Sequence, residues 1–208
     1  MRNNVKPGEW SIPKTRFKDV RKRHRNYGET VMFPSSHDIT VRNRQWAYSV
    51  LSSLLRSGNQ VLIVTKPNLA VTKEIVDNFR HYRDQIIYRF TITSLLDSDL
   101  KQWEPGAPRF QERLDSLKYA FNENYTTSVS VEPMLNAETA IELFYTLEPY
   151  VNETIWFGKM EHQDDPHIGK IAHGKDEPVT YNQIKEIYKA LKNEPKVRWK
   201  TGTKPYFT

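Results

Sequence analysis

Apolar residues along the chain fall into two alternating patterns. Short, nearly continuous apolar runs end in polar loops, and each is followed by a longer segment in which apolar residues recur every three or four positions. The runs predict strands and the periodic segments predict helices. Strands are predicted at 31–33, 61–64, 86–92, within 126–135, and at 154–157 and 197–199; helices are predicted at about 40–57, 69–80, 108–122, 137–147 and 180–192.

The alternation of strands and helices predicts an α/β fold with a parallel sheet. Parallel strands need a crossover connection, and a helical segment lies between every two consecutive predicted strands. Thr180 and Gln183 form a capping-box pattern at the start of the last helix. We predict one domain over residues 31–208 and a basic arm over residues 1–30, with a short helix at 16–26.

One strand carries a row of polar residues, TTSVSVE in sequence. In this polar row, Thr126, Ser128, Ser130 and Glu132 alternate with Thr127, Val129 and Val131, so the first four side chains share one face of the strand. On a half-exposed antiparallel strand, this row would face water. Inside an α/β barrel, the same row would face the barrel axis and contact a polar ligand.

The ends of the other predicted strands are polar as well. In parallel α/β folds, ligands bind at the carboxyl ends of the strands. A buried charge also needs a partner, and Glu132 is a candidate partner for the lysines and the interior arginine. The interior arginine is Arg89, and the candidate residues at the strand ends are Ser35, Ser36, His37, Thr65, Lys66, Thr91, Thr93, Ser94, Ser130, Glu132 and Lys159.

Missing residue types and motifs narrow the chemistry. The 208 residues contain no cysteine, which excludes disulfides, thiol nucleophiles, zinc–thiolate sites and any iron–sulfur cluster ligated by this chain's own thiolates. No glycine-rich phosphate loop or nucleophile elbow is present, which argues against a kinase-like or hydrolase function. The group His162, Asp164, His167 and His173 matches no metal-binding spacing, so we predict a solvated loop over 161–178 and no metal site.

The net charge of +6 lies entirely in the N-terminal segment. Residues 1–30 hold nine Lys/Arg and three Asp/Glu, whereas the 22 Lys/Arg and 22 Asp/Glu of the remaining chain cancel. Such an arm either attracts nucleic acid or another polyanion, or forms a solvated, flexible end. The sequence contains neither a secretory signal nor an apolar stretch of about 18 residues that would span a membrane, so a cytoplasmic location is the default expectation.

Several sequence segments resemble those of one known family, both in their residues and in their order along the chain. These strings are VMFPSSHDIT at 31–40, QVLIVTKP at 60–67, YRFTIT at 88–93, WEPGAP at 103–108, FQERLDSLKYA at 110–120, SVSVEPML at 128–135 and IWFGKM at 155–160. Together they resemble the barrel half of radical S-adenosylmethionine proteins of the spore-photoproduct-lyase-like group, over roughly residues 9–200.

The resemblance implies a partial (β/α)6 barrel. In the family, the first strand is followed by a CxxxCxxC loop that holds a four-iron, four-sulfur cluster, which reductively cleaves S-adenosylmethionine. This sequence has neither that strand nor the cysteines. We therefore expect the first βα unit to be missing, the cluster to be present only if another chain supplies its ligands, and the isolated chain to be inactive and to bind S-adenosylmethionine weakly or not at all.

The resemblance also implies roles for individual residues. Ser35, Ser36 and His37 stand where the family contacts the methionine end of the cosubstrate. Arg89 and Thr91 match positions that face the ribose and the carboxylate.

Residues Ser128, Ser130 and Glu132 match the strand that lines the adenosine side, and Lys66 and Lys159 match further pocket positions. In this context, the ligand-facing interpretation of the polar row is favoured over the solvent-facing one.

Three functions are consistent with the sequence. The chain is half of a split radical enzyme, a cluster-less module that binds a nucleoside-like ligand or a partner, or a nucleic-acid-associated protein that uses its basic arm. A missing first unit would leave the edge of strand 31–33 open. We expect the arm, through Trp10, Ile12 and Phe17, or a second polypeptide to cover that edge. Deletion of residues 1–26 should then cause aggregation or dimerisation.

Overall fold

Six parallel strands form one sheet in a computed structural model that describes residues 15–160 and 178–207. Their spatial order follows the chain, so each strand pairs with the next one in sequence. This arrangement confirms the predicted α/β fold with a parallel sheet and is consistent with a partial barrel. The strands are β1 (Val31–Phe33), β2 (Val61–Thr65), β3 (Ile86–Thr91), β4 (Thr126–Val131), β5 (Ile155–Phe157) and β6 (Val197–Trp199).

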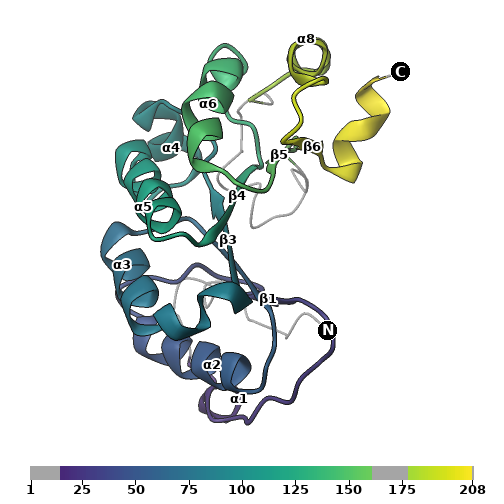
Figure 1. The fold of residues 1–208 in the computed structure, drawn as a ribbon. Helices are drawn as coiled ribbons and strands as arrows, with labels where there is room; N and C mark the ends of the chain where they lie inside the picture. The colour runs from purple at the N-terminus through teal and green to yellow at the C-terminus, as the bar shows by residue number, and fades with distance from the viewer. Residues whose placement is uncertain (1–14, 161–177, 208) are drawn as a thin grey trace.

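The helices flank one side of this sheet, as right-handed crossovers between neighbouring parallel strands require (Figure 1). The capping box of Thr180 and Gln183 at the start of the last α-helix is present as predicted. The α-helices are α1 (Phe17–Val20), α2 (Arg44–Arg56), α3 (Leu69–Asn78), α4 (Asp97–Trp103), α5 (Phe110–Asn122), α6 (Ala140–Leu147) and α8 (Tyr181–Leu191), and 3-10 helices cover Arg80–Gln85, Glu148–Tyr150 and Thr201–Phe207.

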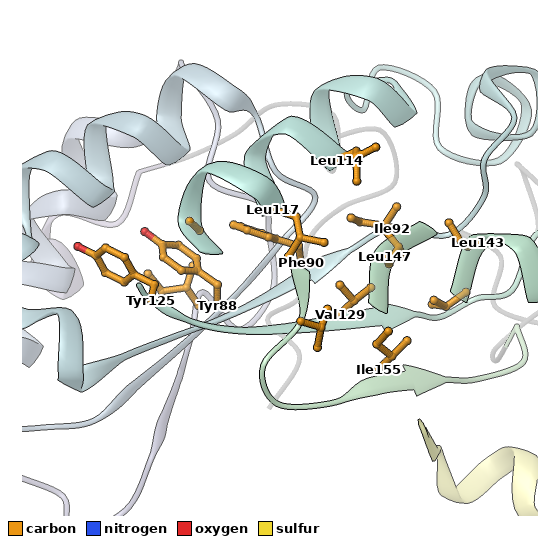
Figure 2. Close-up of a cluster of buried hydrophobic side chains, with 14 of the residues drawn as sticks. Tyr88, Phe90, Ile92, Leu114, Leu117, Tyr125, Val129, Leu143, Leu147 and Ile155 are labelled. Carbon is orange, nitrogen blue, oxygen red and sulfur yellow. The ribbon is translucent and has the colours of Figure 1, made fainter. Parts of the chain in front are cut away.

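The hydrophobic core lies between the sheet and the helices (Figure 2). On β3, Tyr88 and Phe90 are almost fully buried and stack with ring centroids 4.9 Å apart. From the helix side, Leu117 of α5 lies over Phe90 and Leu114 lies over Ile92, as the helical spacing of these leucines predicts. Because side chains alternate along a strand, the residues between these aromatics point to the opposite face of the sheet. We call that opposite side the inner face.

Two segments differ from the sequence-based expectation. The insertion at 95–108 contains a helix, α4, in which only Leu100 is buried, so no apolar period marked it. The basic helix predicted at 16–26 is limited to the four residues of α1. Residues 22–27 are held by side chains of α2 and the turn after it, which replace intrahelical hydrogen bonds; one example is the Asn59 amide, which donates to the Arg25 carbonyl at 2.9 Å.

The strands β1 and β6 form the two edges of the sheet among the described residues. Phe17 does not cover the β1 edge as expected. Its ring packs against Trp46 of α2, with centroids 5.0 Å apart and planes at 87°. Trp10 and Ile12 lie outside the described residues, so their expected docking on β1 stays a prediction. No helix in the described ranges is long and apolar enough to cross a membrane.

Candidate functional site

The strand register brings five of the ten predicted ligand residues onto the inner face. Arg89 of β3 is paired with Ser128 of β4, and Thr91 is paired with Ser130. The chain continues from Ser130 to Glu132, which lies one alternation further along the same face. Ser128 and Ser130 are buried, whereas Arg89, Thr91 and Glu132 are partly exposed. This row runs toward the carboxyl ends of the strands, where ligands bind in parallel α/β folds.

Arg89 is the central cation of the inner face. Its Nε donates to Ser128 Oγ at 3.1 Å, and Ser128 Oγ donates in turn to the Thr154 carbonyl at 2.7 Å. The guanidinium lies 5.3 Å from the centroid of the Trp156 ring, and its nearest carboxylate, Glu153, is 3.9 Å away. Burial lowers the pKa of Arg89, and the charge of Glu153 partly offsets that shift. Arg89 is therefore a positioned cation whose ion pair with Glu153 is long, at 3.9 Å.

Glu132 is paired with Lys200, a residue that sequence analysis did not single out. Its Oε2 lies 2.9 Å from Lys200 Nζ, which also sits 5.6 Å from the centroid of the Trp156 ring. The Glu132 side chain packs on Gly158. A Cβ at Gly158 would stand 2.7 Å from Glu132 Oε1 and 2.9 Å from its Cγ. The idea that Glu132 neutralises Lys66, Lys159 or Arg89 is thus replaced by a pair formed across β4 and the end of β6.

The two predicted lysines occupy different surroundings. Lys66 Nζ lies 3.7 Å from Asp38 Oδ2, and the Lys66 backbone N–H donates to Asp38 Oδ1 at 2.7 Å. Asp38 thereby joins the loops that follow β1 and β2. At the end of β5, the Lys159 backbone N–H donates to Thr203 Oγ1 at 3.0 Å, which anchors the chain after β6 beside this strand end.

The loop after β1 presents Ser35, Ser36 and His37 to solvent. All three side chains are exposed, and none of them hydrogen-bonds to another residue in the described part of the chain. The next residues turn inward: Asp38 binds Lys66, and the Ile39 N–H donates to Thr65 Oγ1 at 3.1 Å. The structure therefore places 35–37 at the carboxyl ends of the strands without joining them to the row on β3 and β4.

Three further residues complete the inner face. Trp156 is paired with Ser130, and its place between the buried Ile155 and Phe157 was the signal for its orientation. Lys200 has no such signal, because it follows a three-residue strand. Thr93, two positions after Thr91, is 1 % exposed, and its hydroxyl has no hydrogen-bond partner within the described residues.

Ser94, the other polar residue at this strand end, has a structural role instead. Its hydroxyl donates to Asp99 at 2.6 Å and accepts from the Leu96 N–H at 3.0 Å, which fixes the start of α4. The histidine-rich group at 162–173 lies outside the described residues. Within the described ranges, no group of three or more His, Asp or Glu side chains is placed to hold a metal ion.

Comparison with solved structures identifies a shared fold. The chain is similar to the crystal structure of Streptococcus suis SuiB bound to S-adenosylmethionine, with a TM-score of 0.55 and 11 % sequence identity. A second SuiB crystal structure matches with a TM-score of 0.52 and 10 % identity. Each match covers 74 % of this chain and 35 % of SuiB, so the chain spans about a third of that protein's length.

Neither a family model nor a curated protein matches the sequence. At this level of identity, the likeness to SuiB shows the fold alone. It agrees with the barrel architecture that the sequence resemblance implied, whereas membership of the spore-photoproduct-lyase-like group stays a prediction.

Proposed function

We propose that the inner face binds S-adenosylmethionine and that the chain is one half of a radical S-adenosylmethionine site. The observation that carries this proposal is the row formed by Arg89, Thr91, Ser128, Ser130 and Glu132 across β3 and β4, in a fold shared with a protein that was crystallised with S-adenosylmethionine. The finer grouping with spore-photoproduct-lyase-like proteins is part of the same proposal.

The chemistry of this row suits such a ligand. S-adenosylmethionine carries a carboxylate, an amino group, a ribose diol and an adenine ring. A positioned guanidinium such as that of Arg89 binds carboxylates through charge-assisted hydrogen bonds. The Thr93 hydroxyl, next along this row, is buried and has no hydrogen-bond partner among the described residues. By resemblance, 35–37 would contact the methionine end, while Lys66 and Lys159 would line the pocket.

An iron–sulfur cluster does not fit this chain on its own. Cluster ligation in the family needs three thiolates, and the sequence contains no cysteine. Any radical chemistry would therefore need thiolates from outside these 208 residues, on a CxxxCxxC loop that would approach the carboxyl ends of the strands. A cluster-less binding module is the alternative. A cysteine-bearing reading frame beside the encoding DNA would favour the split enzyme, and its absence would favour the module.

Weak binding by the isolated chain is the expected result. A handful of hydrogen bonds, each contributing about 0.5–1.5 kcal/mol, is offset by an association cost of several kcal/mol. A dissociation constant of about 1 mM needs a net binding free energy of about 4 kcal/mol, which is the upper end of this balance. The dissociation constant is measured from amide chemical shifts while the isotope-labelled chain is titrated with S-adenosylmethionine or S-adenosylhomocysteine.

Two matched variants locate the site. Ser130→Val removes a hydroxyl from the ligand end of the row and should weaken the binding measured by these shifts by about two- to tenfold. Thr126→Val changes the exposed start of the same strand and should leave them intact. No shift change at about 10 mM ligand would refute the binding site, and affinity in the low-micromolar range would refute the need for a second polypeptide.

A further inference from the structure

The basic segment at residues 16–27 does not hang free; it lies along α2. Backbone groups of this segment bond to side chains on the last turns of that helix: the His24 N–H donates to Ser53 Oγ at 3.1 Å, and Ser57 Oγ donates to the His24 carbonyl at 2.6 Å. Asn59 completes the attachment, because its Oδ1 accepts from the Tyr27 N–H at 2.8 Å. The backbone is thus fixed, which a purely solvated arm would not need.

The side chains of the same segment point to solvent and carry unbalanced charge. Residues 16–25 contain six cations and one acid, Asp19, and Asp19 pairs with Arg16. The remaining cations are exposed and have no carboxylate within ion-pair distance among the described residues. Fixed, unpaired cations of one sign attract polyanions. The six cations are Arg16, Lys18, Arg21, Lys22, Arg23 and Arg25.

Exposed aromatic rings lie among these cations. Phe17 is 47 % exposed, Trp46 39 % and Tyr27 38 %. The Arg21 guanidinium sits 5.7 Å from the Phe17 ring centroid, and that of Arg25 sits 5.8 Å from the Tyr27 ring. Contiguous exposed apolar surface marks interaction sites, and the Phe17 and Trp46 rings are in contact, with their centroids 5.0 Å apart. We call the six cations and three rings the basic–aromatic surface.

We propose that the basic–aromatic surface binds single-stranded nucleic acid. Cations that track a phosphate backbone, interleaved with rings on which bases stack, are what such strands require. A duplex would use the cations but not the rings, because its bases are already stacked. This surface lies on α1, on the segment that follows it to residue 27 and on α2, at the opposite end of the molecule from α8, and it uses no residue of the inner face (Figure 1). Nucleic-acid binding by this surface can therefore be tested independently of S-adenosylmethionine binding by the inner face.

Fluorescence anisotropy with labelled oligo(dT) and oligo(U) of about 20 nucleotides, long enough for one such site, tests this proposal and separates DNA from RNA. The full chain should bind at least one of them at about 50 mM salt and release it at higher salt. In the triple variant Arg21→Ala/Arg23→Ala/Arg25→Ala, three lost phosphate contacts should make the slope of log affinity against log salt shallower by about 2. Affinity at about 50 mM salt should fall at least tenfold.

A charge-matched control removes three exposed lysines far from the surface, in Lys101→Ala/Lys189→Ala/Lys192→Ala. This variant has the same net charge as the arginine triple variant. It should bind within about twofold of the original chain, because charges more than about 14 Å away are screened at about 50 mM salt. Equal loss in both triple variants, or no binding by the full chain at about 50 mM salt, would overturn the proposal.

The aromatic contribution has its own test. Phe17→Leu/Trp46→Leu keeps apolar side chains between α1 and α2 but removes the ring faces, and it should weaken binding about fivefold or more. Circular dichroism confirms that the variant is folded. Unchanged affinity in this variant, tighter binding to a duplex of the same length, or preferential binding to phosphatidylserine vesicles would each show that the surface does not recognise single strands.

Discussion

The buried ion pair between Arg113 and Glu104 gives the sharpest stability prediction. Arg113 is fully buried and Glu104 is 7 % exposed, with 2.6 Å between Nη2 and Oε2. The same guanidinium donates to the Pro108 carbonyl at 2.8 Å and to the Thr91 carbonyl at 3.3 Å. Arg113 therefore joins the segment after α4 to the end of β3, directly beside the candidate ligand row.

Replacing Arg113 by methionine keeps a long apolar side chain but leaves the Glu104 carboxylate buried without a counter-charge. Removing one partner of a buried pair costs about 3–5 kcal/mol. With a urea dependence of about 2–3 kcal/mol per molar for a domain of this size, the unfolding midpoint should fall by roughly 1.5 M. The protein should still fold, because typical domains are stable by about 5–15 kcal/mol.

Two further variants separate the pair from the general loss of a charge. Arg109→Met, at the exposed start of the same helix, should cost less than about 1 kcal/mol, since its contact with Asp97 spans 3.9 Å in solvent. Arg113→Met/Glu104→Met removes both charges and should be more stable than Arg113→Met alone. A single variant within about 1 kcal/mol of the original chain would show that the pair is not buried as described.

Three more predictions concern the glycine under Glu132, a buried tyrosine and iron. Gly158→Ala should destabilise the fold by about 1–3 kcal/mol in urea unfolding, because the new Cβ overlaps Glu132 and displaces it from Lys200; an unchanged midpoint would contradict this. Burial raises the pKa of Tyr125 to about 12, so the unfolded chain loses this proton near pH 10 while the folded chain keeps it. The stability from Tyr125 is therefore full below pH 10 and is lost as the pH rises toward 12. Tyr125→Phe should flatten that decline in the melting temperature, and an identical decline in both proteins would refute the assignment. Anaerobic reconstitution with iron and sulfide should leave no stoichiometric iron after desalting, since the chain offers no thiolate; retained iron at one cluster per chain would contradict this.

The sheet could be predicted from the sequence because most strands are apolar runs bounded by polar turns and β4 alternates polar with apolar residues. Periodicity likewise located the long helices. Of the five apolar residues that it placed on one face of α2, Ala47, Leu51, Leu54 and Leu55 are buried and Val50 is half-buried. The helix α4 was missed because it is short and buries a single residue. The basic helix at 16–26 was overestimated for the opposite reason. It has no apolar face to drive helix formation, and side chains of α2 bond its backbone instead.

The burial of Arg113 shows what pattern analysis misses. In the helix at 108–122, the apolar positions define the packed face, and an arginine among them reads as exposed. Its partners come from the α4 segment and from β3, and these contacts depend on tertiary structure. A buried arginine with three partners carries no local signal in the sequence.

On the inner face, the alternation of residues along a strand predicts which side chains share a face, whereas their ion-pair partners depend on tertiary structure. Alternation along β3 and β4 was enough to place Arg89, Thr91, Ser128 and Ser130 on one face. The partner of Glu132 is Lys200, which follows β6, and a strand of three residues is too short to show where the next side chain points.

The pairing has a consequence for ligand binding. Lys200 is already neutralised by Glu132 at 2.9 Å, so a ligand carboxylate would have to displace a bonded acid to reach it. Arg89 faces Glu153 at 3.9 Å, and that glutamate is 39 % exposed, which makes their attraction weak. A carboxylate that enters the inner face therefore meets least competition at Arg89. Under the proposed function, Arg89→Gln should weaken binding of S-adenosylmethionine more than Lys200→Gln does, and the reverse order in the same chemical-shift titration would assign the carboxylate to Lys200.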